Sequence, residues 1–159
     1  MRVRIEGEKV ILRSVESSDI DTLLLWENST REPLYGIFEE RYTRKNVELF
    51  VMLQMQYDLV QTEQMRLMIC SPEGERIGSI DLTEYDERKA FVSVLIYEPQ
   101  NRRRGFAERA LRLVISYAQS LGMRSLYATI FPENMPSIKL FEKVGFEGDG
   151  AMLYRLRLR

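Results

Sequence analysis

Segment 98–107 joins an apolar run to an amphipathic run through an arginine-rich turn, EPQNRRRGFA. Residues 91–97 have the composition of a strand, and residues 108–121 have the apolar spacing of a helix. A strand–turn–helix joint of this kind directs several backbone N–H groups and a helix N-terminus at one point, which favours a bound phosphate. Three arginines add positive charge there, and Gly105 lets an anion approach the backbone closely. We therefore expect this turn to bind an anionic cofactor.

The amino-acid composition excludes several classes of site and of protein. The chain has 159 residues, which suits a single domain, 1–159, around one core. It contains no histidine, which excludes histidine-based triads and most zinc sites, so no metal is expected. Its single cysteine, Cys70, forms no internal disulfide and suits a reducing cytoplasm, where we expect the protein. The apolar runs are too short for a secretory signal or a membrane span, so no membrane partner is expected.

The charges are distributed unevenly along the chain. Residues 1–99 hold 12 Lys or Arg and 19 Asp or Glu, whereas residues 100–159 hold 11 and 5. This distribution fits a polyanionic cofactor held by the second part and a cationic acceptor drawn to the first. Scattering of the same charges over a solvated surface is the alternative. The net charge of −1 argues against a nucleic acid partner for the arginine run.

The periodicity of apolar residues predicts an α+β fold. Four helices are expected, at 18–27, from Thr43 onward, at 105–122 and at 136–144. Seven strands are expected, at 9–15, 65–71, 76–83, 90–97, 125–131, 146–147 and 152–158. The short connections between 65 and 97 predict an antiparallel meander, and the strand–helix–strand order that follows predicts a right-handed crossover and a parallel pair. We therefore expect one mixed, mostly antiparallel sheet.

Three sequence patterns, together with this order of elements, carry a resemblance to a known family. The first is RRRGFA at 102–107, which fits Arg/Gln-x-x-Gly-x-Gly/Ala. The second is NMPSIKLFEKVGF at 134–146, close to Asn-x-x-Ser/Ala-x-x-Leu-Tyr-x-x-x-Gly-Phe, and the third is VILRSV at 10–15 followed by SD at 18–19. Over nearly its whole length the chain resembles the GNAT superfamily of acetyl-CoA-dependent N-acetyltransferases, and the third pattern is similar to its ribosomal-protein and spermidine-acetylating branches.

This resemblance implies a GNAT fold, in which the fourth and fifth of the seven strands splay apart and the pantetheine arm of acetyl-CoA lies between them. It assigns contacts with the cofactor to Val94, Leu95, Ile96, Arg102, Arg103, Arg104, Gly105, Phe106, Ala107, Asn134 and Phe141. The strand residues would pair with the arm, the turn residues would hold the pyrophosphate, and Asn134 would lie near the thioester. The plainer interpretations are an ordinary core strand, a solvated arginine run and an asparagine that only caps a helix.

The resemblance also implies direct transfer, within a ternary complex, of an acetyl group from acetyl-CoA to a primary amine. The acceptor could be a polyamine, a protein N-terminus or another small amine. The general base would be a carboxylate near the centre of the sheet, for which Asp81 and Glu84 are the candidates. Glu39 and Glu40 follow the first helix, where spermidine acetyltransferases carry acidic residues that face the polyamine. Surface charge is the alternative for all four.

The family's usual general acid is the tyrosine of its second motif, and this chain has Phe141 at that position. Phenylalanine donates no proton, so either the thiolate leaves unassisted or another phenol serves, with Tyr97, Tyr127 and Tyr154 as candidates. This departure keeps a non-catalytic acyl-CoA sensor of the same fold as the alternative function. The segment after the second motif is also shorter than in spermidine acetyltransferases, which weakens a polyamine assignment.

Two further questions concern partners. A nucleotide-binding or phosphoryl-transfer domain is disfavoured, because the sequence contains neither Gly-x-x-x-x-Gly-Lys-Ser/Thr nor Gly-x-Gly-x-x-Gly. Members of the superfamily are often dimeric, so a homodimer is one option. The alternating apolar residues of the last strand, Tyr154, Leu156 and Leu158, would either pair with a second copy or pack in the core.

Overall fold

The computed structural model describes residues 2–29 and 42–159 of the chain. Its centre is one eight-stranded sheet with the order β1-β2-β3-β4-β5-β6-β8-β7. The strands are β1 (Arg4–Glu6), β2 (Ile11–Ser14), β3 (Met65–Cys70), β4 (Arg76–Thr83), β5 (Lys89–Ile96), β6 (Ser125–Thr129), β7 (Glu147–Gly148) and β8 (Leu153–Arg157). All neighbouring strands are antiparallel except β5 and β6, which are parallel. The expected α+β fold with a mixed sheet is confirmed.

The described residues form five α-helices. They are α1 (Ile20–Ser29), α2 (Arg44–Gln56), α3 (Leu59–Thr62), α4 (Phe106–Ser120) and α5 (Met135–Lys143), with 3₁₀ turns η1 (Ser17–Asp19) and η3 (Pro99–Asn101). Thr43 caps α2 as predicted, because its side chain accepts a hydrogen bond from the backbone N–H of Asn46. Gly122 follows α4 with a φ of 85°, a conformation that suits glycine and ends the helix.

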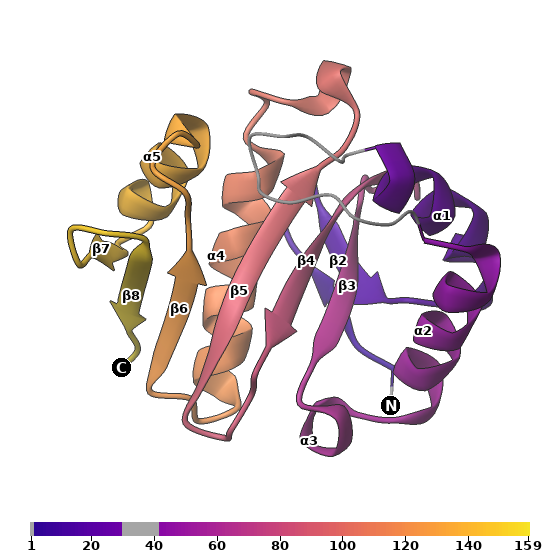
Figure 1. Ribbon diagram of the computed structural model, residues 1–159, viewed down its shortest axis with the longest axis horizontal. Helices are drawn as coiled ribbons and strands as arrows, with labels where there is room; N and C mark the ends of the chain where they lie inside the picture. The colour runs from indigo at the N-terminus through magenta and orange to yellow at the C-terminus, as the bar shows by residue number, and fades with distance from the viewer. Residues whose placement is uncertain (1, 30–41) are drawn as a thin grey trace.

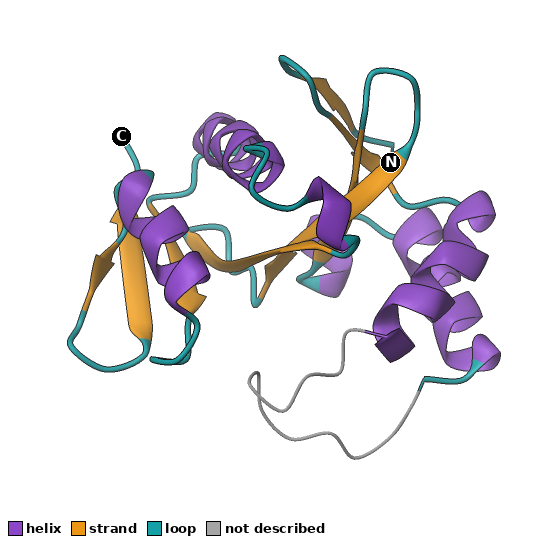
Figure 2. Ribbon diagram, turned by 90° about the horizontal axis from the view of Figure 1, so that it is seen from above, coloured by secondary structure: helices purple, strands orange, loops and turns teal. Residues whose placement is uncertain are grey.

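The helices cover both faces of the sheet, α4 on one face and α1 with α2 on the other (Figure 2). The buried stripe of α4 consists of Ala110, Leu111, Val114 and Ala118, spaced at three and four residues. It packs in the larger apolar core, together with Leu126 of β6 and Phe141 of α5. Trp26 of α1 belongs to a second, smaller core on the other face. Complete burial of a large apolar side chain stabilises the fold by about 1.5–3 kcal/mol.

The parallel pair of β5 and β6 is short. Only three pairs of residues join these strands: Lys89 with Ser125, Ala90 with Leu126 and Phe91 with Tyr127. Beyond them β5 continues to Ile96 without pairing to β6, and Figure 1 shows the two strands separating toward their carboxyl ends in front of α4. This confirms the predicted splay. We call the region between the strands beyond Phe91 and Tyr127 the fork.

A buried ion-pair network fixes the start of α1 to the sheet. The carboxylate of Asp19 is 0% exposed and accepts hydrogen bonds from Nη1 and Nη2 of Arg13, both at 2.8 Å. It also accepts from Nε of Arg76 at 2.7 Å and from the backbone N–H of Glu16 at 2.9 Å. Arg13 lies on β2 and Arg76 on β4, so one carboxylate connects η1 to two strands.

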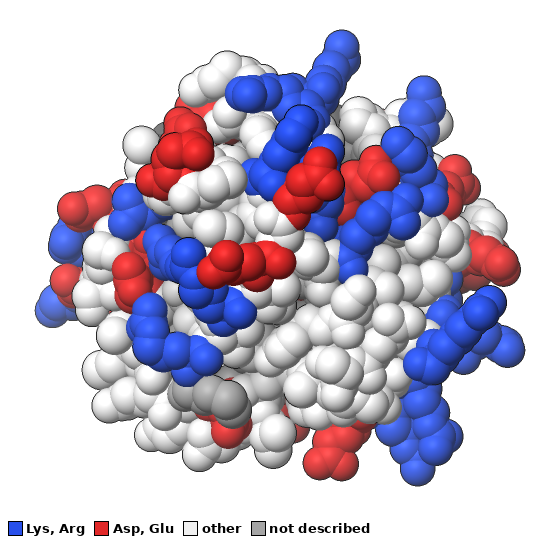
Figure 3. All heavy atoms as spheres, turned by 180° about the vertical axis from the view of Figure 1, so that it is seen from behind, with Lys and Arg blue, Asp and Glu red and all other residues white. Residues whose placement is uncertain are grey.

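Acidic and basic side chains lie close together on the face that carries α4 (Figure 3). On α4 itself, Glu108 lies between Arg112, at 3.1 Å, and Lys143 of α5, at 2.9 Å. Arg109 pairs with Glu8 at 3.7 Å. None of the helices formed by residues 2–29 and 42–159 is sufficiently long and apolar to span a membrane.

Candidate functional site

The turn between β5 and α4 presents a row of backbone N–H groups with no protein acceptor. Within the described part of the chain, the N–H groups of residues 103–107 make no hydrogen bond. Arg103 and Gly105 have φ angles of 61° and 82°, the left-handed conformation found in turns whose successive N–H groups bind anions. The N-terminus of α4 begins at the same place and adds its partial positive charge. Such a turn can bind an anion.

Arg102 has a different role from the residues that follow it. Its backbone N–H donates to the carbonyl oxygen of Pro99 at 3.1 Å. Its guanidinium donates from Nε to the carbonyl oxygen of Ile96 at 3.1 Å and from Nη2 to that of Tyr97 at 3.2 Å. Arg102 therefore holds the end of β5 against the turn, and its own N–H is already used.

The other two arginines of the run are exposed. Arg104 donates from Nη1 to the side-chain oxygen of Asn101 at 3.3 Å, and its guanidinium lies 5.1 Å from the ring centre of Phe106. Ala107 and Phe106 are half-buried at the start of α4 and pack against the larger core. The guanidinium of Arg104 therefore lies beside the first residue of α4.

The edge of β5 that faces the fork has free backbone groups. The backbone N–H of Tyr97 donates to the carbonyl oxygen of Ile77 of β4. The direction of the backbone N–H and C=O groups alternates along a strand, so those of Leu95, two residues earlier, also point toward β4. A close approach of the Leu95 carbonyl oxygen to Gly78 of β4 agrees with this. The backbone N–H and C=O groups of Val94 and Ile96 therefore point into the fork. Of their groups, the Ile96 carbonyl is taken by Arg102.

Phe141 lies on α5, and Asn134 is the residue that precedes this helix, after the end of β6. The side chain of Asn134 caps this helix by accepting from the backbone N–H of Ser137 at 3.4 Å. Phe141 is 2% exposed, and its ring meets that of Phe146 edge to face at 5.0 Å. Phe141 therefore belongs to the packed core.

The three candidate phenols occupy different environments. Tyr127 is the last residue of β6 that pairs with β5, and its ring lies 5.6 Å from that of Phe91. Tyr97 is buried at the far end of β5, where its hydroxyl lies 3.3 Å from that of Ser79. Burial raises the pKa of Tyr97 to about 12. Tyr154 is buried in the larger core, so Tyr127 is the phenol at the point where the strands part.

The candidate carboxylates differ in their distance along the sheet from the fork. Asp81 of β4 is opposite Ser93 of β5, beyond the last β5–β6 pair. Glu84 is exposed and follows Thr83, which is opposite Phe91 at the closed end of the fork. Glu39 and Glu40 lie outside the described residues.

Asp81 belongs to a cluster that sequence reasoning did not find. Arg66 of β3 donates from Nε and Nη2 to the two oxygens of Asp81, both at 2.8 Å, and from Nη1 to Oε1 of Glu27 at 2.6 Å. The Arg66 guanidinium also lies 4.9 Å from the ring centre of Phe50. Burial opposes the charge of Arg66, but Asp81 and Glu27 outweigh it and raise the pKa of the guanidinium. Glu27 follows Leu23 by four positions on α1, so the two lie on the same face of the helix, the face that is buried at Leu23. A charged residue at that position was the one sign in the sequence that Glu27 faces the sheet.

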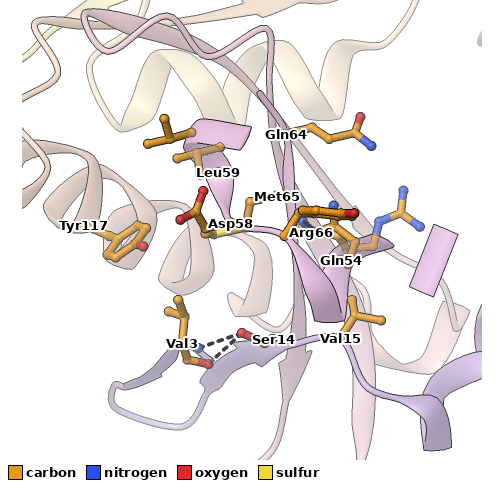
Figure 4. Close-up of a pocket in the computed structure, with 12 residues that line it drawn as sticks. Val3, Ser14, Val15, Gln54, Asp58, Leu59, Gln64, Met65, Arg66 and Tyr117 are labelled. Atoms are coloured by element: carbon orange, nitrogen blue, oxygen red, sulfur yellow. Dashed lines mark hydrogen bonds between the residues drawn. The ribbon is translucent and has the colours of Figure 1, made fainter. Parts of the chain in front are cut away.

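A cavity lies among β2, β3, α3 and α4 (Figure 4). Its volume is about 80 Å³, and its lining includes Val3, Tyr57, Asp58, Leu59 and Tyr117. These residues come from the segment before β1, the α2–α3 connection, α3 and α4. Arg66 of β3 also lines the cavity, which therefore adjoins the ion-pair cluster, but no residue of β5 or β6 does. We therefore place the candidate site at the fork and the turn, where the free backbone groups are. In residues 2–29 and 42–159, no group of three His, Cys, Asp or Glu side chains is arranged to hold a metal ion.

Known proteins resemble this chain in sequence and in fold. Residues 9–147 match the model of the acetyltransferase (GNAT) domain. The spermidine N(1)-acetyltransferase of Escherichia coli (strain K12) is 29% identical over 152 residues, which cover 93% of this chain and 78% of that protein.

Solved structures share the fold. The GNAT-family acetyltransferase from Bacillus anthracis superposes with a TM-score of 0.80 at 20% identity, over 98% of both chains. The spermidine N-acetyltransferase from Vibrio cholerae, solved in complex with CoA and spermine, superposes with a TM-score of 0.79 at 20% identity, over 96% of both chains.

Proposed function

The chain belongs to the GNAT family of acetyl-CoA-dependent N-acetyltransferases, and we propose that it transfers acetyl directly to a primary amine while both substrates are bound. The name of the Escherichia coli relative makes a polyamine the first acceptor to test. A protein N-terminus and other small amines are the further candidates.

The single observation that carries this proposal is the position of the unsatisfied turn beside the open fork. The free N–H groups of residues 103–107, with the N-terminus of α4, suit a pyrophosphate. The unpaired backbone N–H and C=O of Val94 and the N–H of Ile96 suit the amide groups of a pantetheine arm. Arg102 keeps these two parts in a fixed relation by holding the end of β5. The residues present therefore fit acetyl-CoA.

Bound acetyl-CoA supplies the activated acetyl thioester, and the chain positions it and moves protons. The N–H of Val94 points into the fork and is suited to stabilise an oxygen that gains negative charge. An alkylammonium has a pKa near ~10 and must lose a proton before it attacks. Asp81, opposite Ser93, is our first candidate to receive that proton through water, and Glu84 is the second.

The departing thiolate requires little assistance, because a thiol has a pKa of about 8.5. Phe141 donates no proton, so a general acid is either absent or supplied by a phenol. Tyr127 is the first candidate for that role because it ends the paired part of β6, and Tyr154 and Tyr97 are more deeply buried. Holding both substrates side by side then provides much of the acceleration.

A thiol-release assay tests the proposal. The full chain is incubated with acetyl-CoA and one of four amines: spermidine, spermine, a short peptide with a free N-terminus, or butylamine. We expect amine-dependent release of CoA and a product heavier by one acetyl group in the mass spectrum, with the highest kcat/KM for a polyamine. Binding of acetyl-CoA without release on any amine would instead support the non-catalytic sensor.

A further inference from the structure

The Glu27–Arg66–Asp81 cluster carries two negative charges and one positive charge. Arg66 uses Nε and Nη2 for the two oxygens of Asp81, and only Nη1 reaches Glu27, at Oε1. Within the described part of the chain, Oε2 of Glu27 accepts no hydrogen bond. Among the described residues, Oε2 of Glu27 is therefore the one carboxylate oxygen of the cluster with no hydrogen bond, and the cluster carries a net charge of −1.

Through Arg66 and Asp81, the cluster is anchored on β3 and β4, next to the strand that borders the fork. Arg66 and Asp81 are opposite each other on β3 and β4, and Asp81 is opposite Ser93 on β5. Ser93 is exposed and lies beyond the last pair that joins β5 to β6. Glu27 is also close enough to Tyr97, at the end of β5, for its charge to act on the phenol and raise its pKa.

The cluster is accessible to a small cation yet partly removed from water. The side chains of Arg66, Asp81 and Glu27 are 15%, 20% and 23% exposed. Charges interact more strongly in such a position than at a fully solvated surface. A pair of Arg66 with Asp81 alone would be electrically balanced, so the charge of Glu27 is not needed to neutralise the guanidinium.

We infer that Glu27 binds the ammonium group of the acceptor amine and holds it beside the fork. The inference rests on the proposed function. A primary ammonium carries three donors, of which one reaches Oε2 of Glu27 and the others remain for water or neighbouring acceptors. Arg66 orients Glu27 through Oε1, so that the free oxygen keeps one position.

The test measures steady-state kinetics of Glu27→Gln with each amine of the panel that the wild-type enzyme acetylates. Glutamine keeps an oxygen that accepts from Arg66 but removes the negative charge. We expect KM for the amine to rise about tenfold, the effect of losing one hydrogen bond between charged groups. We expect kcat at saturating amine and KM for acetyl-CoA to change by less than about twofold.

Three comparisons keep the outcome clear. Glu73→Gln, on the exposed turn between β3 and β4, is the matched control and should leave both KM values unchanged. Glu27→Asp keeps the charge and should restore part of the affinity for the amine. The melting temperature of each variant detects loss of folding. If Glu27→Gln melts at a lower temperature than wild type, calorimetry compares the affinity of Glu27→Asp and of wild type for spermidine. Equal affinities count against the inference.

Failure of the proposed function and failure of the role of Glu27 give different results. If wild type releases no CoA with any amine, the proposed function fails. If wild type is active but Glu27→Gln keeps its KM for every amine, only the role of Glu27 is overturned. A parallel loss of kcat and of affinity for acetyl-CoA would also overturn it, because that pattern indicates a structural role for the ion pair.

Discussion

At Asp19 the chain buries a carboxylate completely between two arginines. Replacement of Asp19 by Asn leaves Arg13 and Arg76 close together with only the more distant Glu16, 4.0 Å from Arg13, as a counter-charge. Removing one partner of a buried ion pair costs about 3–5 kcal/mol, and Arg76 is partly exposed, so we expect about 3 kcal/mol. Urea unfolding at pH 7 measures this difference. The exposed Glu73→Gln should stay within about 0.5 kcal/mol of wild type.

The same variant tests how this stability depends on pH. Burial acts to raise the pKa of Asp19, but hydrogen bonds from Arg13 and Arg76 lower it below the ordinary value. A carboxyl whose pKa is lower in the folded state contributes stability above its unfolded pKa, about 3.9, and loses it as the pH falls through the folded pKa. The difference between wild type and Asp19→Asn should therefore narrow below about pH 4. A difference that stays constant from pH 7 to pH 3 would contradict this account.

The role of a single residue was predictable from the sequence only where the chemistry of its side chain decides that role. Phe141 donates no proton wherever it lies, and its place in the core adds only that it packs on Phe146. Asp81 was identified as a carboxylate near the sheet centre, but its partner Arg66 was not. Arg66 and Glu27 are 39 positions apart, and only the packing of α1 on the sheet brings them together.

The strands β4 and β5 approach each other closely at Gly78. A Cβ on this residue would overlap the carbonyl oxygen of Leu95, which is backbone and cannot move away alone. We expect Gly78→Ala to destabilise the fold by about 3 kcal/mol, at the upper end for overpacking, and to weaken binding of CoA because β5 must shift. Thermal unfolding and CoA titration measure the two effects.

Gly74→Ala is the comparison for this prediction. Gly74 has a φ of 91° but no atom within 4 Å of the added Cβ, so only backbone strain is expected, about 1–2 kcal/mol. Binding of CoA by Gly74→Ala should equal that of wild type. If Gly78→Ala binds CoA as tightly as Gly74→Ala does, the close approach at Gly78 does not control the position of β5.

The elements with strong periodicity were predicted well, and the short ones were not. The meander and α4 follow from alternation and from spacing at three and four residues. β1 was missed because it has only three residues, two of them charged, and forms by pairing with β2. α3 is a single turn that depends on the cap at Asp58. The exact length of the β5–β6 pair was also beyond prediction from the residues alone, because tertiary packing sets it.

At the scale of the whole molecule, binding of CoA should stabilise the fold. A ligand at one hundred times its Kd adds about 2.7 kcal/mol to the free energy of unfolding. For a chain of this size that corresponds to a rise in melting temperature of about 5–10 °C. Differential scanning fluorimetry with saturating CoA checks this. An equal rise with ATP would point instead to general nucleotide binding at the turn.

The short pairing between β5 and β6 also divides the sheet into two parts, which we call wings. One wing contains β1 to β5 and the other contains β6, β8 and β7. Within the sheet only three residue pairs connect them, and the crossover through α4 and the larger apolar core join them outside it. A pantetheine arm that pairs with β5 in the fork would act as an additional strand shared by both wings. The same backbone groups would then both bind the substrate and join the two wings. Substitutions that bring the wings closer together should therefore leave less room for the pantetheine arm.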